Sequence, residues 1–170
     1  MPSETNMTER DALNVIDVLT NGGAEIWIAG GWAVDAVVGE TTRPHRDLDL
    51  AIRSEHLETA IAGLGQLGYA RTLDLLPVRL VMEAPGGRCV DLHPVTFDAA
   101  GFGRQVGDEG RVYEYPTEGF GTGRIGGRTV PCLTADQLVR FHLGYEPLDH
   151  DRHDMALLRE RLQVEVPPPY

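Results

Sequence analysis

The chain has 170 residues and 42% hydrophobic content, which suits one compact domain with a core of ordinary size. Its formal net charge is −11, and so acidic a surface disfavours nucleic acid as a partner, because such binding depends on basic contacts to phosphate. Neither a membrane span of roughly 18 to 20 apolar residues nor the apolar segment of a signal peptide is present, which predicts a cytoplasmic protein.

The first part of the chain predicts a helix, a strand and a second helix in succession. Apolar residues recur at helical spacing from Thr8 to Leu19, and Gly22-Gly23 ends this helix. Ala24 to Ala29 has the composition of a short buried strand. Gly30-Gly31 then provides a turn into a helix from Trp32 to Val38.

The middle of the chain predicts a strand, a helix and three further strands. Leu48 to Ile52 is strand-like, and Ser54 is placed to cap a helix that runs to Leu67 and stops at Gly68. The three strands are expected at Tyr69 to Leu73, Val78 to Glu83 and Arg88 to Val95, with a Pro85-Gly86-Gly87 hairpin turn before the last.

A Gly-rich region from Gly101 to Gly127 follows, and short strands are expected within it. These strands are Val112 to Tyr115 and Gly119 to Ile125, the second entering a hairpin through Gly126-Gly127 towards Val130. Thr134 then caps a helix to about His142, with Gln137 in the position of a capping box. A last helix runs from about Asp149 to Leu162.

These elements predict a mixed α/β (α+β) fold in which helices flank a mixed β-sheet. We expect a core domain at residues 1–133, a small C-terminal helical segment at 134–163 and a flexible tail at 164–170. The tail is rich in proline from Val166 to Tyr170 and should be extended or disordered.

Two acidic residues carry the strongest chemical signal. Asp47 and Asp49 lie two apart on a predicted strand, so their side chains project from one face while Leu48 and Leu50 point to the core. Two carboxylates this close repel each other unless a cation lies between them, which makes the pair a candidate divalent-metal site. Nearby arginines could compensate the two charges instead.

Two further features strengthen the metal interpretation. Gly30-Gly31 stands at a strand–helix junction, where small residues let a phosphate approach the N–H groups at the positive helix end. Asp91 lies in a later strand and could supply, from a strand next to that of Asp47 and Asp49, a third carboxylate that ligates metal and accepts a proton from an attacking hydroxyl. The simpler alternatives are an ordinary tight turn and a solvated strand residue.

The order of these features resembles the polymerase β-type nucleotidyltransferase superfamily: a strand, Gly-Gly, a helix, a D-x-D motif and a later single aspartate. The closer match is to the lincosamide and aminoglycoside 2''-nucleotidyltransferases, over about residues 26–158. The residues that carry it are Gly30 to Ala36, Thr42-Arg43, His45 to Asp49, Val90 to Val95, Val130 to Leu133, Phe141 to Glu146 and Asp151.

The resemblance implies a nucleotidyltransferase fold and a role for each of these residues. Asp47 and Asp49 would hold Mg²⁺ on ATP or another nucleoside triphosphate, and Gly30-Gly31 would pack against its phosphates. Asp91 would complete what is expected to be a two-metal site and act as general base on the acceptor hydroxyl.

Basic residues near the acids could contact the triphosphate. Arg43, Arg46 and Arg79 are the candidates, although each could also balance local acids or lie at the surface. In the family the last helix often begins with a Lys-Asp pair that reaches the nucleotide, and here His150 and Asp151 take these positions. A histidine is only partly charged at neutral pH, so its phosphate contact would be weaker.

Other histidines and acids allow a second interpretation. His150, His153 and Asp154 share a helix face and could bind a metal, as in a hydrolase, but a solvated helix start explains them as well. His93 shares a face with Asp91 and could support the metal site or pack within the sheet.

Trp32 and Tyr145 could stack on a base or an acceptor but fit equally as core aromatics. Cys89 and Cys132 lack metal-like spacing and are expected to be buried thiols of a reduced protein. By the resemblance, the Gly-rich region lies near the acceptor, where acidic groups would favour an amine-bearing antibiotic; most of them could equally serve solubility. These acids are Asp98, Asp108, Glu109, Glu114 and Glu118.

The sequence therefore predicts an enzyme that transfers a nucleoside monophosphate, AMP from ATP in the leading hypothesis, to a hydroxyl of a small and cationic molecule such as a lincosamide or aminoglycoside. A second subunit could complete the acceptor pocket in a homodimer. Two alternatives remain: a toxin-like nucleotidyltransferase that modifies tRNA or protein, and a catalytically weak binding protein with the same fold. The net charge of −11 weighs against tRNA.

Overall fold

The structure is a computed structural model, and it describes residues 6–170. Its helices are α1 (Glu9–Asn21), α2 (Gly30–Val38), α3 (Leu57–Gln66), α4 (Ala135–Phe141) and α5 (Asp149–Leu162). Its strands are β1 (Ile26–Ala29), β2 (Asp47–Arg53), β3 (Ala70–Leu75), β4 (Arg79–Ala84), β5 (Arg88–Phe97), β6 (Gly103–Val106), β7 (Val112–Tyr115), β8 (Phe120–Ile125) and β9 (Arg128–Leu133). Short 3-10 helices are η1 (Ser54–His56), η2 (Asp108–Gly110) and η3 (Thr117–Gly119).

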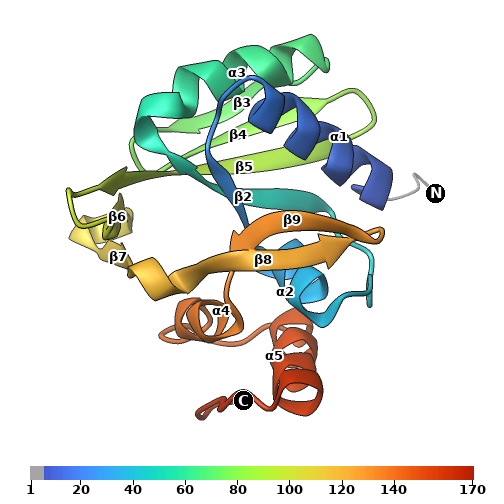
Figure 1. Ribbon diagram of the computed structural model, residues 1–170, viewed down its shortest axis with the longest axis vertical. Helices are drawn as coiled ribbons and strands as arrows, with labels where there is room; N and C mark the ends of the chain where they lie inside the picture. Colours follow the sequence, from blue (N-terminus) through green and yellow to red (C-terminus); the bar gives the residue numbers. More distant parts are fainter. Residues whose placement is uncertain (1–5) are drawn as a thin grey trace.

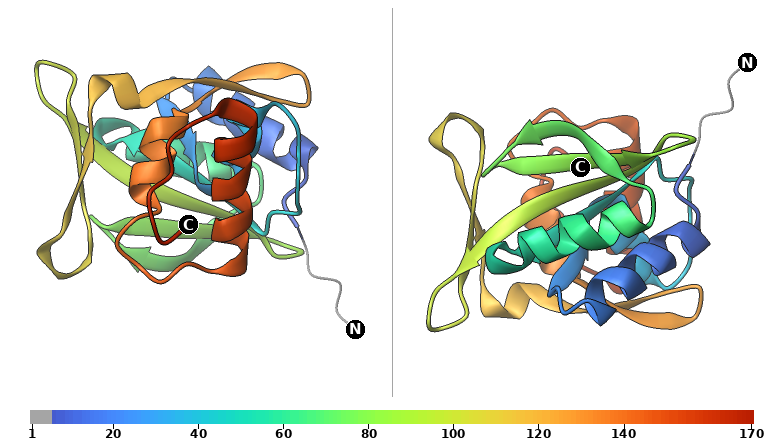
Figure 2. Two further views of the ribbon diagram at one scale, coloured as in Figure 1. Left: turned by 90° about the horizontal axis from the view of Figure 1, so that it is seen from below. Right: turned by 90° about the horizontal axis from the view of Figure 1, so that it is seen from above.

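The strands form one mixed sheet with helices on both faces, which confirms the predicted fold class (Figure 1). The strand order is β3-β4-β5-β2-β1-β9-β8, and the β6–β7 hairpin continues from β5. Helices α1 and α3 lie on one face and α2, α4 and α5 on the other (Figure 1). Seen from below, α4 and α5 lie across this second face, with the end of the chain beside them (Figure 2).

The centre of the sheet is the parallel pair β2 and β5, which is buried on the face that packs under α1 and α3 (Figure 2). Leu48 and Leu50 of β2 and Leu92 of β5 are fully buried there. Alternation along a strand then turns the odd-numbered residues of both strands to the opposite face, towards α4 and α5. This central burial fixes the register of the pair, because a slip of one residue would expose the leucines.

Helix boundaries follow the sequence closely, with three differences. Helix α2 begins at Gly30 itself, two residues earlier than predicted. Ser54 does not cap α3: it opens η1, and its Oγ lies 3.4 Å from Thr96 Oγ1. Thr134 does cap α4, but the side chain of Gln137 donates to the Glu114 carbonyl instead of returning to the cap. Within residues 6–170, no helix is long and apolar enough to cross a bilayer.

One strand was not predicted. Strand β6 lies in the Gly-rich region and pairs with both β5 and β7, and the hairpin that it forms extends beyond the edge of the central strands (Figure 1). Gly103 begins this strand with no room for a side chain, since an added Cβ would lie 2.6 Å from Val95 Cγ1. The composition did not indicate this strand, because glycine is depleted in strands and Gly101, Gly103 and Gly107 lie in or beside it.

The proline-rich end of the chain is irregular up to Pro167 and then turns at Pro168-Pro169, where the Tyr170 N–H donates to the Pro167 carbonyl at 3.4 Å, so it is not extended throughout as expected. It lies against the helices and is not free (Figure 2). The Tyr170 hydroxyl donates to the His142 carbonyl at 2.7 Å, and Arg159 Nη2 donates to the Tyr170 carbonyl at 2.9 Å. The division into a core, a helical segment and a tail stays a prediction.

Candidate functional site

The candidate site is an acidic surface formed where β1, β2 and β5 lie side by side. Asp49 of β2 pairs in register with Asp91 of β5 on one side and with Ala29 of β1 on the other. Asp47 lies two residues before Asp49 and faces the same way. The register therefore brings together the three carboxylates that the sequence singled out.

Gly30 follows β1 directly and lies against the Asp49 carboxylate. Its φ of +61° is in the left-handed region, and an added Cβ would collide with Asp49 Oδ2. Any residue larger than glycine would therefore be strained and would push the carboxylate aside. This position shows why the strand–helix junction needs glycine: the backbone of α2 begins in contact with the acidic site.

We expect Gly30→Ala to lower the free energy of unfolding by about 1 to 3 kcal/mol and to weaken divalent-cation binding, because Asp49 must move. Thermal unfolding and isothermal titration with Mg²⁺ measure the two effects. Gly65→Ala is the matched control: its added Cβ meets nothing within 4 Å, and an alanine within α3 should be neutral or slightly stabilising. Equal behaviour of the two variants would contradict the assigned contact.

The second glycine has a different neighbourhood. A Cβ on Gly31 would collide with Arg43 Nη2 and would lie 2.7 Å from His45 Nδ1. The guanidinium of Arg43 and the imidazole of His45 thus lie directly against the first turn of α2, next to the positive end of the helix dipole. This arrangement suits an anion such as a phosphate.

The acidic surface offers a set of metal donors. One oxygen each from Asp49 and Asp91 and a nitrogen of His93 lie within 4.8 Å of one another, and this is the group of potential ligands that residues 6–170 contain. Asp91 Oδ1 is buried and has no hydrogen-bond partner within the same residues. Carboxylate oxygens are the ligands that Mg²⁺ prefers, so the residues present fit a divalent cation.

Asp47 lies outside this tight group but belongs to the same electrostatic unit. Burial by the surrounding protein and the charges of Asp49 and Asp91 raise the pKa of Asp47, although its side chain lines a cavity that opens over the acidic surface. Burial, followed by the Asp49 charge, likewise raises the pKa of Asp91 against the effect of Arg79 and His93. A cation bound between these carboxylates would stabilise their charged forms.

The sequence suggests only a supporting role for His93, and the structure places this residue between two of the acids. Its Nε2 lies 3.6 Å from Asp49 Oδ1 and 3.6 Å from Asp91 Oδ1. Burial opposes protonation of His93, but the Asp49 and Asp91 carboxylates outweigh this effect and raise its pKa.

The three candidate arginines differ in what they contact. Arg79 Nη1 donates to Asp91 Oδ2 at 2.8 Å, so it holds the oxygen that faces away from the donor group. Arg43 forms a two-bond pair with Asp154, at 2.9 Å from Nε and 2.7 Å from Nη2, which raises the pKa of Arg43. Arg46 lines the cavity and makes no hydrogen bond to any of residues 6–170. Arg46 therefore has the most freedom to contact a ligand.

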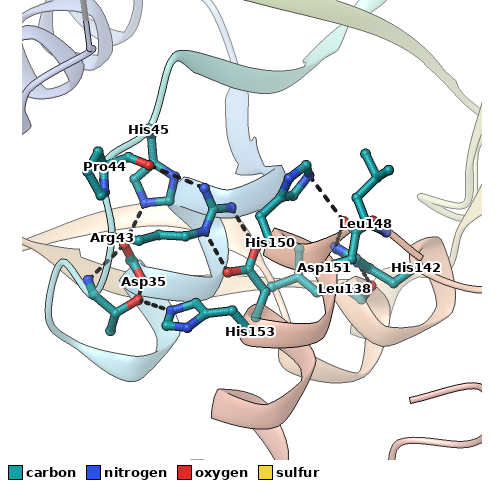
Figure 3. A network of polar contacts seen from close by, with 12 residues as sticks. Asp35, Arg43, Pro44, His45, Leu138, His142, Leu148, His150, Asp151 and His153 are labelled. Carbon is teal, nitrogen blue, oxygen red and sulfur yellow. Dashed lines mark hydrogen bonds and ion pairs between the residues drawn. The ribbon is translucent and has the colours of Figure 1, made fainter. Parts of the chain in front are cut away.

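A buried network fixes the loop between α2 and β2 (Figure 3). Asp35, within α2, accepts from His45 Nε2 at 2.5 Å and from the backbone and hydroxyl of Thr42 at 3.1 and 2.6 Å. Thr42 Oγ1 also lies 3.0 Å from His153 Nε2 on α5. Together with the Arg43–Asp154 pair, this network joins the loop before Asp47 to α5.

These contacts also test the alternative prediction of a metal site on α5 formed by His150, His153 and Asp154. Both carboxylate oxygens of Asp154 are bound by Arg43, and His153 contacts Thr42. Within residues 6–170 these two side chains do not join His150 in a group of metal donors. The hydrolase interpretation therefore has no support.

His150 and Asp151 lie at the start of α5 (Figure 3), and both line the cavity. His150 is half exposed, with Nε2 3.5 Å from Asp151 Oδ1. Asp151 is buried, and its Oδ2 accepts the Leu148 N–H at 2.9 Å, as an acidic residue in the first turn of a helix does. Asp151 Oδ1 also lies 3.6 Å from His142 Nε2.

A cavity of about 1110 Å³ opens over the acidic surface and contains every candidate site residue. Aromatic and aliphatic side chains make up part of its lining. These side chains include Val78, Tyr113, Tyr115, Leu138, Phe141 and Tyr145. A cavity of this size, partly lined by apolar side chains, suits a small-molecule acceptor beside a nucleotide.

Several secondary predictions are corrected by this cavity. Tyr145 is not a core aromatic, since it is 45% exposed and lines the cavity, whereas Trp32 is buried in the core. Of the five acids in the Gly-rich region, Asp108 alone borders the cavity. Cys132 is buried but Cys89 is only partly so, and burial raises the pKa of both thiols to about 12.

Comparison with known proteins agrees with this geometry. The family model of aminoglycoside-2''-adenylyltransferases matches residues 11–158. A lincosamide resistance protein of Staphylococcus haemolyticus is 27% identical over 154 residues, which cover 91% of this chain and 96% of the relative. A 2''-aminoglycoside nucleotidyltransferase of Escherichia coli is 29% identical over 120 residues, 71% of this chain and 64% of the relative.

Solved structures share the fold. The lincomycin-bound crystal structure of the lincosamide antibiotic adenylyltransferase LnuA matches with a TM-score of 0.83 and 27% identity, over 91% of this chain and 98% of that one. The structure of ANT(2'')-Ia in complex with adenylyl-2''-tobramycin matches with a TM-score of 0.72 and 21% identity, over 91% and 88%. The resemblance drawn from the motifs is confirmed, and the chain belongs to the aminoglycoside-2''-adenylyltransferase family of nucleotidyltransferases.

Proposed function

We propose that the protein adenylylates a hydroxyl group of a lincosamide-like or aminoglycoside-like antibiotic, with ATP as donor and Mg²⁺ as cofactor. The observation that carries the proposal is the convergence of Asp49, Asp91 and Gly30 at one end of a cavity large enough for two small molecules. Family membership supports transfer of a nucleotidyl group as the reaction class.

In the proposed reaction the acceptor oxygen attacks the α-phosphorus of ATP, and the bond from that phosphorus to the β-phosphate bridging oxygen breaks. The acceptor becomes an AMP ester and pyrophosphate leaves. Asp91 takes the hydroxyl proton: Arg79 holds its Oδ2, and Oδ1, which lies 3.6 Å from His93 Nε2, has no hydrogen-bond partner among residues 6–170. Mg²⁺ held by Asp47, Asp49 and Asp91 would neutralise the triphosphate and the developing charge.

The other residues of the site bind and orient. The first turn of α2 at Gly30-Gly31 receives phosphate oxygens, and Arg46 can reach them without losing a partner. Arg43 keeps two N–H groups beyond its bonds to Asp154 and Pro44 and can assist. Beyond proton transfer and charge neutralisation, these residues would contribute to the rate by positioning the two substrates, because the reaction needs little covalent participation by the protein.

The acceptor wall favours a molecule with one amine and an apolar part over one with many amines. Tyr113 and Phe141 form this wall, with Asp108 as the acid beside it. A polycationic aminoglycoside would need more free carboxylates than the wall offers. The relative with lincosamide resistance also matches over more of this chain than the aminoglycoside relative does.

The proposal is tested by incubating the protein with ATP, Mg²⁺ and either lincomycin or tobramycin, and measuring pyrophosphate release and the mass of the product. We expect an AMP ester with both and a higher kcat/KM with lincomycin. Labelling of tRNA or of a protein from ATP, without turnover of any antibiotic, would favour the toxin-like alternative. ATP binding without turnover of any of these acceptors would favour the alternative of a catalytically weak binding protein.

We expect His150→Lys to lower the KM for ATP about fivefold, which corresponds to roughly 1 kcal/mol. A lysine keeps a full charge at neutral pH, whereas a histidine does so only in part. Initial rates against ATP concentration measure the effect, with His56→Lys as control because His56 lies outside the cavity. An unchanged KM would show that this position does not reach the nucleotide.

A further inference from the structure

A chain of hydrogen bonds connects the β6–β7 hairpin to the acidic site. The Tyr115 hydroxyl donates to Gln105 Oε1 at 2.5 Å, and Gln105 Nε2 lies 3.2 Å from His93 Nδ1. His93 Nε2 then faces Asp49 and Asp91, at 3.6 Å from an oxygen of each. Tyr115 and Gln105 are buried, so water does not compete strongly for these contacts.

The order of donors along this chain is determined by its first step. A Tyr115 hydroxyl that donates to Gln105 requires the amide oxygen at that end, which leaves the amide nitrogen to donate to His93 Nδ1. The same nitrogen lies 3.3 Å from the Val78 carbonyl, an acceptor that also requires an N–H there. Neutral His93 must then carry its proton on Nε2, the atom that faces the two acids. This nitrogen therefore cannot ligate a cation, which leaves the carboxylates of Asp49 and Asp91 as the metal ligands of this group.

We propose that Tyr115, Gln105 and His93 form a positioning relay that directs the His93 Nε2–H between the Asp49 and Asp91 carboxylates and holds them in their converged arrangement. The inference rests on the proposed function for its effect on catalysis. It adds a role for the hairpin: the element that borders the acceptor wall through Asp108 and Tyr113 also sets the geometry of the acids.

The physical need for the relay comes from the charges. Asp49 and Asp91 are paired across adjacent strands and repel each other. An N–H group between them offsets that repulsion, so that less free energy is lost in bringing them together when substrate and cation bind. Groups that orient ligands of a metal site in this way typically affect metal affinity or activity by about 10- to 100-fold.

The first measurement is the tautomer of His93, which needs no substrate. With ¹⁵N-labelled histidine, at a pH high enough that the His93 signals no longer change with pH and the imidazole is neutral, we expect the Nε2–H tautomer in the wild-type protein. In Gln105→Leu, which removes the donor to Nδ1, we expect a mixture of both tautomers. A wild-type Nδ1–H signal would overturn the proposal, whatever the enzyme's substrate.

The second measurement is the split between kcat and KM. We expect Gln105→Leu to lower kcat for adenylyl transfer about 10- to 100-fold with the KM for ATP within about twofold of wild type. Gln137→Leu is the matched control: this glutamine is equally buried and also binds the hairpin, through Glu114, but has no contact with the acids. If the kcat of Gln105→Leu equals that of Gln137→Leu, the relay has no role and the proposal fails.

Gln105→Leu alone leaves the buried Tyr115 hydroxyl without an acceptor and could for that reason fail to fold. The double variant Gln105→Leu with Tyr115→Phe removes this hydroxyl as well. It should fold and show the same loss of kcat and the same mixed tautomer. A wild-type kcat in the folded double variant overturns the relay. If wild-type protein turns over no acceptor at all, the proposed function fails, and the tautomer measurement alone decides the relay.

Discussion

Asp91→Asn is expected to lower kcat for adenylyl transfer by at least about 1000-fold, within the range attributed to a general base, without unfolding the protein. An asparagine can keep the contact with Arg79 through its amide oxygen, but it cannot accept the proton of the attacking hydroxyl. The loss should therefore appear in kcat more than in the KM for ATP. Product formation measured by mass spectrometry, together with thermal unfolding of the same sample, checks both parts.

Asp47→Asn and Asp49→Asn should also abolish transfer, but for a different reason, because each removes a charge that holds the cation. Isothermal titration with Mg²⁺ should show weaker binding in both. Asp74→Asn provides the control: Asp74 is exposed and pairs with Arg71 on the edge strand β3. Wild-type activity in either Asp47→Asn or Asp49→Asn would refute the assigned metal site.

The acidic part of the site could be predicted because it depends on local rules. Strand alternation places Asp47 and Asp49 on one face of the sheet. Asp91 could be singled out because it is the one acidic residue of an otherwise largely apolar predicted strand. Gly30-Gly31 was recognisable at the strand–helix junction, although the collision between a Cβ on Gly30 and Asp49 is visible only in three dimensions. The pairing of Asp49 with Asp91 depends on β2 and β5 being neighbours, which their separation along the chain does not reveal.

Contacts that join distant segments could not be predicted in the same way. Gln105 lies in a Gly-rich stretch whose strand was missed, and nothing in its neighbours points to His93. Arg43 was expected at the phosphates, but its main partner is Asp154 on the last helix. The sequence did contain one signal of the buried network: Asp35 is a charged residue among alanines and valines in a helix that is apolar throughout.

Asp35→Ala is expected to lower the free energy of unfolding by about 3 kcal/mol, because two polar groups lose their acceptor at about 1 to 3 kcal/mol each. Asp35 is 1% exposed and its partner His45 is 3% exposed. The substitution removes the acceptor of the buried His45 Nε2 and of the partly buried Thr42 N–H. For a chain of this length the loss corresponds to a fall in Tm of about 6 to 12 °C.

The pH dependence of this effect has a definite sign. Burial alone would raise the pKa of Asp35, but the His45 and Thr42 hydrogen bonds lower it below its ordinary value. A carboxyl group with a lowered pKa contributes stability that is complete above its ordinary pKa of about 3.9 and is lost as the pH falls below that value. The difference in Tm between wild type and Asp35→Ala should therefore be constant near neutral pH and shrink below about pH 4.

Asp17→Ala separates the buried network from the general effect of removing an aspartate. Asp17 pairs with Arg128 at 2.6 Å, but both side chains are largely exposed, and such surface pairs contribute little. We expect its Tm to stay within about 1 °C of wild type. Because the network holds the loop that leads into Asp47, Asp35→Ala should also weaken Mg²⁺ binding at temperatures where it is still folded. An Asp35→Ala protein as stable as Asp17→Ala would show that the loop is held by packing alone, and that the buried charge does not stabilise the site.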